Sequence, residues 1–171
     1  MKKTFITILI GLIILSGTTF CQENEGNNKI GLSGTLQSGQ MGVLMPLSLG
    51  AKFALVPAID FTYAEDVGTD IGIALSPRFY LKKEKILPYW GFRIGTLINI
   101  PAADNEVNDG TKFDILAGLN FGGEYFIADQ FSLGVEAQGN FTKSDKNSGR
   151  FGNPGAINFN LGTMIFATVY F

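Results

Sequence analysis

The sequence predicts an all-β protein, an eight-stranded antiparallel up-and-down transmembrane β-barrel preceded by a signal peptide. Two observations lead to this fold class. After residue 29, apolar and polar residues alternate with a period of two in eight successive segments, as in strands whose two faces meet different surroundings. The ionisable residues in the middle of these segments all lie on the more polar face, and the other face is apolar along nearly its whole length.

The composition excludes several other classes of protein. The chain of 171 residues is 46% hydrophobic and 12% aromatic, which is too apolar for a disordered protein. It has one cysteine, so it has no disulfide scaffold, and its net charge of −2 leaves no broad basic surface for nucleic acid. It contains no histidine, the side chain that most often acts as a general base or metal ligand. The composition therefore disfavours an enzyme.

The first 21 residues have the layout of a secretory signal peptide. Two lysines precede the apolar run Phe5–Leu15, and small and polar residues follow it. The run is shorter than the ~20 apolar residues of a transmembrane helix. We expect cleavage after Cys21; the alternative, a lipoprotein acylated at Cys21, has Phe20 where a small residue is usual. The predicted parts are the signal peptide at residues 1–21, a short polar segment at 22–29 and the barrel at 30–171.

Eight strands are predicted, and the pattern is clearest in Phe131–Thr142, where apolar and polar or small residues alternate throughout. The second segment is the least regular, because Leu44 and Pro46 interrupt its polar face. Three further prolines, at positions 57, 77 and 88, fall inside predicted strands, where bulges or frayed pairing would accommodate them. The predicted strands are residues 30–37, 41–50, 53–64, 70–81, 86–99, 113–126, 131–142 and 157–171.

After the first connection, which is short, the connections alternate between tight turns and longer loops. Alternate connections of an up-and-down meander lie at opposite ends of the barrel, so we expect the tight turns and both termini at one end and the loops at the other. The predicted tight turns are residues 51–52, 82–85 and 127–130, and the predicted loops are residues 65–69, 100–112 and 143–156.

The placement of charge distinguishes a membrane barrel from a soluble one. No lysine lies in the middle of a predicted strand, whereas a soluble barrel would spread Lys and Glu over its outer face. An Arg or Lys facing lipid at the membrane midplane would cost ~2–4 kcal/mol, so the charged face is expected to point inward. The alternative is a soluble lipocalin-like binding barrel with its apolar face inside. The predicted inward charge network is Asp60, Arg78, Arg93, Asp114, Glu124 and Glu136.

Aromatic residues on the apolar face gather near both ends of the strands, as in the two aromatic girdles of a membrane barrel. They are Phe53, Phe79, Tyr125, Phe131 and Phe171 toward the tight turns, and Phe61, Tyr63, Phe113, Phe141 and Phe159 toward the long loops.

With its signal sequence, its eight amphipathic segments and the terminal run Ile165–Phe171, the chain resembles the small eight-stranded outer-membrane β-barrels of Gram-negative bacteria, the OmpX-like and OmpA-barrel-like families. The resemblance implies a porin-like barrel in the outer membrane, in contact with its lipid. It also implies that Val169, Tyr170 and Phe171 form the C-terminal signal read by the barrel-assembly machinery. A periplasmic tethering domain after Phe171 is not expected.

Eight strands enclose an interior that side chains just fill, so the charge network is expected to be a structural plug. Its surplus of acids would be met by water, by a proton or by hydroxyls such as Thr62 and Tyr80. The alternative is a polar path through the outer membrane for an ion or another small solute.

No catalytic, cofactor-binding or metal-binding residues are predicted. Without histidine no Ser-His arrangement forms, and Glu124 and Glu136 lack a cleft for a sugar. The acidic residues of the loops match no calcium loop. The expected function is therefore non-enzymatic: envelope structure, or contact with a surface ligand through loops 100–112 and 143–156.

Overall fold

The computed structural model describes residues 29–37, 40–65, 68–81, 85–102, 110–148 and 150–171. The predicted signal peptide lies outside the described residues, as does the centre of the predicted loop 100–112. No helix among the described residues is long and apolar enough to cross a membrane.

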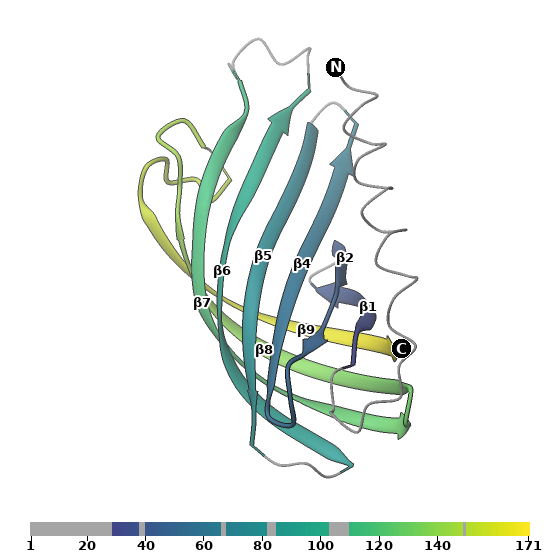
Figure 1. Ribbon diagram of the computed structural model, residues 1–171. Coiled ribbons are helices and arrows are strands. Elements are labelled where there is room, and N and C mark those ends of the chain that lie inside the picture. Colours follow the sequence, from purple (N-terminus) through teal and green to yellow (C-terminus); the bar gives the residue numbers. More distant parts are fainter. Residues whose placement is uncertain (1–28, 38–39, 66–67, 82–84, 103–109, 149) are drawn as a thin grey trace.

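The strands form one antiparallel sheet that closes on itself (Figure 1). Each strand pairs with its neighbours in sequence, and β1 pairs with β9 to close the barrel. β2 and β3 both pair with β4, so they act as one broken strand and the nine segments make eight strands. The segments are β1 (Gly31–Gln37), β2 (Gln40–Leu44), β3 (Leu47–Ser48), β4 (Phe53–Ala64), β5 (Gly68–Tyr80), β6 (Ile86–Pro101), β7 (Lys112–Ala128), β8 (Phe131–Lys143) and β9 (Ile157–Tyr170).

All eight predicted strands are confirmed, and the least regular one is the one that breaks. The break falls at Met45 and Pro46, between β2 and β3. The backbone remains bonded there, because the Met45 amide donates to the Pro57 carbonyl at 2.9 Å and the Gly31 amide donates to the Pro46 carbonyl at 2.8 Å. Pro77 interrupts the β5–β6 ladder between Leu75 and Arg78, and the register is unchanged on both sides. The register shift lies elsewhere, in β7 between residues 126 and 128.

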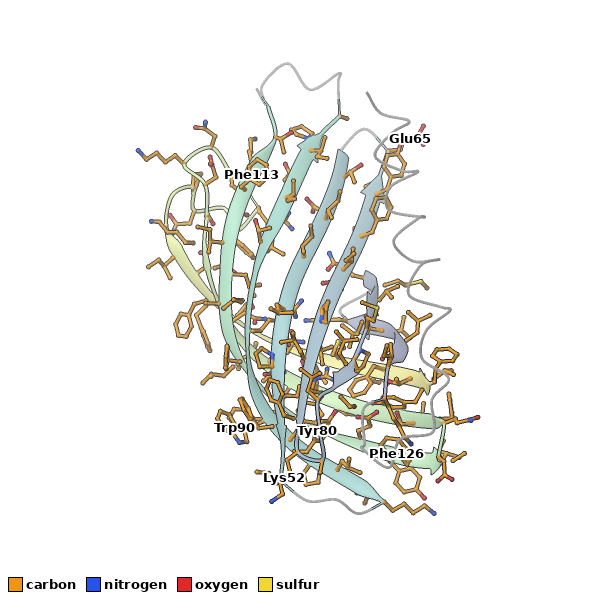
Figure 2. All side chains as sticks on the ribbon, viewed as in Figure 1. Lys52, Glu65, Tyr80, Trp90, Phe113 and Phe126 are labelled. Carbon is orange, nitrogen blue, oxygen red and sulfur yellow. The ribbon has the colours of Figure 1, made fainter. Side chains whose placement is uncertain are left out.

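The two ends of the barrel differ as predicted. Short connections join β3 to β4, β5 to β6 and β7 to β8 at one end, which we call the tight-turn end. Lys29 and Phe171 also lie there: the Lys29 ammonium donates to the Asp129 carbonyl at 3.1 Å, and the Phe171 amide donates to the Ile30 carbonyl at 2.8 Å. The connections after β4, β6 and β8 form the long-loop end. Figure 2 shows Lys52 and Phe126 at the tight-turn end and Glu65 and Phe113 at the other.

The apolar face of the sheet points outward and the polar face points inward, as the charge placement predicts. Large apolar side chains are exposed on the outside along the strands; Ile94 is 51% exposed and Leu161 is 79% exposed. Polar and charged side chains fill the inside, where Arg78 and Glu136 are each 1% exposed. A soluble protein would bury the first set and expose the second.

Aromatic rings lie on the outer face near both ends. At the tight-turn end, the Phe79 ring stacks on Trp90 with centroids 4.8 Å apart and lies 5.2 Å from Phe53. At the long-loop end, the rings of Phe141 and Phe159 are 4.9 Å apart. The side chains of Trp90 and Phe113 are both exposed, and Figure 2 shows that of Trp90 projecting away from the barrel. The arrangement matches the two girdles expected of a spanning barrel.

Inward-facing glycines make room for the large inward side chains. A Cβ added to Gly122 would lie 2.5 Å from the Tyr89 hydroxyl and 2.6 Å from the Val135 carbonyl oxygen. Its neighbour Gly123 faces outward, and nothing lies within 4 Å of a Cβ added there. At this position the narrow interior is filled by the large side chain of Tyr89 packed over a glycine.

Candidate functional site

The six predicted charged residues all project into the barrel interior. Arg78, Asp114, Glu124 and Glu136 are each 1% exposed and Arg93 is 8% exposed, while Asp60 is half-buried. The structure does not bring all six into one ion-paired network, although Arg78 interacts electrostatically with both Glu136 and Glu124. They form three clusters along the barrel axis, around Glu124, around Glu136 and around Asp114.

The Glu124 cluster lies nearest the tight-turn end and consists of hydroxyl groups around one carboxylate. The hydroxyls of Ser132, Tyr170 and Tyr80 donate to the Glu124 carboxylate at 2.5, 2.7 and 3.1 Å. No cationic side chain among the described residues forms an ion pair with Glu124. Three hydroxyl donors satisfy this buried carboxylate, and Arg78 interacts with it electrostatically from beyond ion-pair distance.

The Glu136 cluster is the centre of the interior. Arg78 Nη2 donates to Glu136 Oε2 at 2.7 Å, with both side chains almost fully buried. The Arg78 guanidinium lies against two aromatic rings, 4.6 Å from the Tyr89 centroid and 5.0 Å from the Phe166 centroid. The cost of burying an ion pair falls when its remaining hydrogen-bonding groups are satisfied, which holds for Glu136, whereas Arg78 Nε and Nη1 have no hydrogen-bond partner among the described residues. Glu136 receives three further donors, from Tyr89 at 2.7 Å, Gln138 at 2.7 Å and Asn120 at 3.1 Å.

Arg93 extends the Glu136 cluster toward β1 and β4. Its Nη1 donates to Gln138 Oε1 at 2.7 Å, and its Nη2 lies 3.2 Å from Asp60 Oδ2. The same Gln138 oxygen accepts from Gln37 Nε2 at 3.1 Å. Strands from opposite sides of the barrel are therefore tied together across its interior.

The Asp114 cluster closes the interior at the long-loop end. Arg150, from the loop between β8 and β9, places Nε 3.2 Å from Asp114 Oδ2 and Nη2 2.7 Å from Asp70 Oδ1. Asp114 also accepts from the Ser148 hydroxyl at 3.1 Å and from the Asp145 amide at 2.8 Å. The loop thus folds across the mouth of the barrel and is held there by ion pairs.

Sequence reasoning missed several of these residues. Arg150 lies in a loop, where no periodic pattern gives the direction of a side chain. The surplus of acids among the predicted inward charges was the only indication that a further cation binds inside the barrel. Phe166 and Met164 also face inward, although the last strand otherwise alternates as predicted. Tyr80 was expected to satisfy an acid, and the structure pairs it with Glu124.

The last three residues lie at the tight-turn end of β9. Val169 and Phe171 point outward and are 44% and 79% exposed, while Tyr170 points inward to Glu124. Their role as an assembly signal stays a prediction.

The interior offers no described site for a metal. Among residues that the structure describes, no group of three or more His, Cys, Asp or Glu side chains could hold an ion. Its carboxylates are engaged by arginines, amides and hydroxyls.

Comparison with known proteins shows the fold. No family model matches the chain, and no curated protein matches its sequence. The crystal structure of Neisserial surface protein A (NspA) is 12% identical with a TM-score of 0.57, over 84% of this chain and 94% of that chain. The N-terminal β-barrel domain of Pseudomonas aeruginosa OprF is 13% identical with a TM-score of 0.59, over 86% of this chain and 100% of that chain. The chain therefore has the closed eight-stranded fold of small outer-membrane barrels.

Proposed function

We propose that this protein is a non-enzymatic integral barrel of a bacterial outer membrane, with a plugged interior and a surface role carried by its long loops. The observation that supports this best is the orientation of the sheet, with apolar side chains outside and ion pairs inside. Hydrocarbon is the surrounding in which an uncharged outer wall is stable. The likeness to outer-membrane barrels supports the same location.

Of the long loops whose residues the structure describes, the loop between β8 and β9 is the strongest candidate for surface contact. Its base is anchored by Arg150 and Ser148, which bind inside the mouth. Turn hydrogen bonds fix its conformation: the amides of Ser148 and Gly155 donate to the Asp145 carbonyl at 3.0 and 2.9 Å. A loop ordered before binding loses less entropy when it meets a partner. Its exposed residues, available to a surface ligand, are Lys146, Asn147, Gly152, Asn153 and Pro154.

The mature chain is expected to require detergent for solubility and to migrate differently on gels before and after boiling. A closed barrel with buried ion pairs resists unfolding by detergent at room temperature and loses its compact shape only on heating. Semi-native electrophoresis checks this directly. A monodisperse monomer in buffer without detergent would contradict the proposal and favour the soluble lipocalin-like barrel.

The barrel is expected to show no steady conductance in planar bilayers. The pairs Arg78–Glu136 and Arg93–Asp60 cross the interior, and the Arg150 loop covers one mouth. Several buried polar atoms have no hydrogen-bond partner among the described residues, and Asn120 Oδ1, Asn140 Oδ1 and Thr142 Oγ1 are among them; such atoms favour the channel alternative because they would bind water along the axis. Reproducible unitary currents that depend on protein concentration would establish the channel and refute the plug.

A further inference from the structure

A cavity lies inside the barrel at the tight-turn end. Its volume is about 460 Å³, within the range of sites that bind small molecules. Its inner part is lined by the buried side chains of Tyr80, Glu124 and Tyr170, and its mouth by Lys29 and residues of the turns. Figure 2 shows Tyr80 and Phe126, another lining residue, at this end of the barrel. We call this space the tight-turn cavity.

Among the described residues, Glu124 is the inward acid that no arginine meets in an ion pair. Its donors are three hydroxyl groups, which satisfy its hydrogen bonding and bring no positive charge. Arg78 acts on it only electrostatically, since the guanidinium is paired with Glu136. The inner part of the cavity therefore carries a negative charge. The other four acids each have an arginine nitrogen within 3.2 Å; they are Asp60, Asp70, Asp114 and Glu136.

The Glu124 carboxylate has an acceptor site left for a ligand. Among the described residues, its Oε1 accepts from Ser132 and Tyr170, and its Oε2 accepts from Tyr80 alone, at 3.1 Å. Each carboxylate oxygen has two acceptor sites. Oε2 is therefore the atom that remains to accept from a donor in the cavity.

The walls of the cavity suit both hydrocarbon and positive charge. Four aromatic rings line it, and two of them, those of Phe126 and Tyr170, stack with centroids 5.4 Å apart. Aromatic faces attract cations and also pack against hydrocarbon. The four rings belong to Phe53, Tyr80, Phe126 and Tyr170.

Two described lysines line the mouth of the cavity, and both have partners there. The Lys29 ammonium donates to the Asp129 carbonyl at 3.1 Å. The Lys85 ammonium lies 5.2 Å from the ring centroid of Tyr125, a residue of the outer face. These contacts hold both ammonium groups at the rim.

We propose that the tight-turn cavity binds a small organic ammonium ion. Its N–H group donates to Glu124 Oε2, and its hydrocarbon part packs against the rings of Phe126 and Tyr170. An anion would face the charge of Glu124, and a hard metal ion needs more oxygen ligands than one carboxylate among aromatic rings supplies. The ligand enters from the aqueous compartment at the tight-turn end, because the cavity lies within the barrel rather than on its apolar outer wall. The inference goes beyond the proposed surface role and does not rest on it.

Titration with n-butylammonium tests the site. The chain has five tyrosines, so selective labelling of their rings gives a small set of NMR signals. In nonionic detergent micelles, n-butylammonium is expected to shift the signals of Tyr80 and Tyr170 saturably and to leave that of Tyr63, exposed on the outer face, unchanged. Butyrate and n-butanol, which are of similar size and carry no positive charge, are expected to bind about ten-fold more weakly or not at all.

Three variants identify the group that binds the ligand. Glu124→Gln removes the charge and keeps the shape of the side chain, so it is expected to weaken binding of n-butylammonium about ten-fold. Asp60→Asn is the matched control, because it neutralises an inward acid outside the cavity and is expected to leave the affinity unchanged. Tyr80→Phe removes the hydroxyl that donates to Oε2 and is expected to tighten binding several-fold, with Tyr170 as the reporter. The heat-dependent gel shift shows that each variant is folded.

The contrary outcomes are equally definite. Wild-type protein without saturable shifts, equally tight binding of n-butanol, or an unchanged affinity in folded Glu124→Gln would each overturn the ammonium site. If Glu124→Gln does not fold, weaker or unchanged binding in Tyr80→Phe contradicts the proposal instead. Nanodiscs distinguish the source of the amine. Weaker binding of n-butylammonium in phosphatidylethanolamine than in phosphatidylcholine would show that a lipid headgroup occupies the cavity, and a free amine would be excluded as the ligand.

Discussion

Replacing Arg78 with alanine is expected to lower the free energy of unfolding of the barrel by about 3–5 kcal/mol, because it removes one partner of a fully buried ion pair. Glu136 would remain in the centre of the interior with hydrogen-bond donors and no cation within salt-bridge distance. The substitution also removes the guanidinium that packs against Tyr89 and Phe166. The measurement is the urea or guanidinium midpoint of the barrel in detergent micelles, followed by the gel shift.

A double substitution separates the charge from the packing. Arg78→Met with Glu136→Gln removes both charges and keeps most of the volume, so it is expected to recover most of the stability lost in Arg78→Ala. Arg150→Ala serves as a comparison. Its partner Asp70 is one-third exposed, so water would take over part of that interaction, and its buried partner Asp114 keeps the Ser148 hydroxyl and the Asp145 amide as donors. A wild-type midpoint for Arg78→Ala would show that the Glu136 cluster does not depend on this ion pair.

Gly122→Ala is expected to destabilise the barrel by about 1–3 kcal/mol or more, through overpacking of the interior. The new Cβ would lie 2.5 Å from the Tyr89 hydroxyl, closer than the 3.0 Å below which real Cβ atoms are essentially never found. It would also meet the Val135 carbonyl oxygen at 2.6 Å, so moving the tyrosine alone does not relieve the contact. Tyr89 would have to leave Glu136 at the same time, which removes one of its hydrogen bonds.

Gly123→Ala is the matched control for this substitution. The two glycines are adjacent in β7 and change by the same methyl group, but Gly123 faces outward into open space. Alanine at position 123 is expected to leave the unfolding midpoint unchanged or to raise it slightly, since glycine weakens a strand through its backbone entropy. Equal effects at both positions would mean that the inward and outward faces of β7 are not packed as described.

Sequence periodicity predicted the barrel well because it depends on local physics. Alternation in Phe131–Thr142 fixes which residues share a face, and the burial of Glu136 beside exposed Val135 follows from it. The inward direction of the charged face followed from the cost of charge in lipid rather than from any motif. Even the weak second strand was informative, since Pro46 lies where the strand breaks.

The sequence did not predict which inward side chains contact one another across the barrel. The pattern placed Arg78 and Glu136 on the inner face, but their contact depends on strand stagger, which brings β5 and β8 together across the interior. Arg150 binds Asp70 and Asp114 from a loop, where no repeating pattern predicts the direction of a side chain. The pairing of β1 with β9 only as far as Gln37 and Met164 depends on where each strand ends, and the sequence gives strand boundaries only to within a few residues.

The seam between β1 and β9 has a consequence for how the molecule is made. The hydroxyls of Ser33 and Thr168 meet there at 2.7 Å although the two residues are 135 positions apart. Ser33 is synthesised long before Thr168. The edges of the sheet at β1 and β9 therefore have no strand partner until the last strand has been synthesised. Unpaired edge strands pair with other chains and promote aggregation. Pairing β1 with β9 is also slow, because it brings together residues that are far apart in the sequence. We therefore expect the barrel to close only after the whole chain has been synthesised, because the β1–β9 seam needs residues from both ends of the chain.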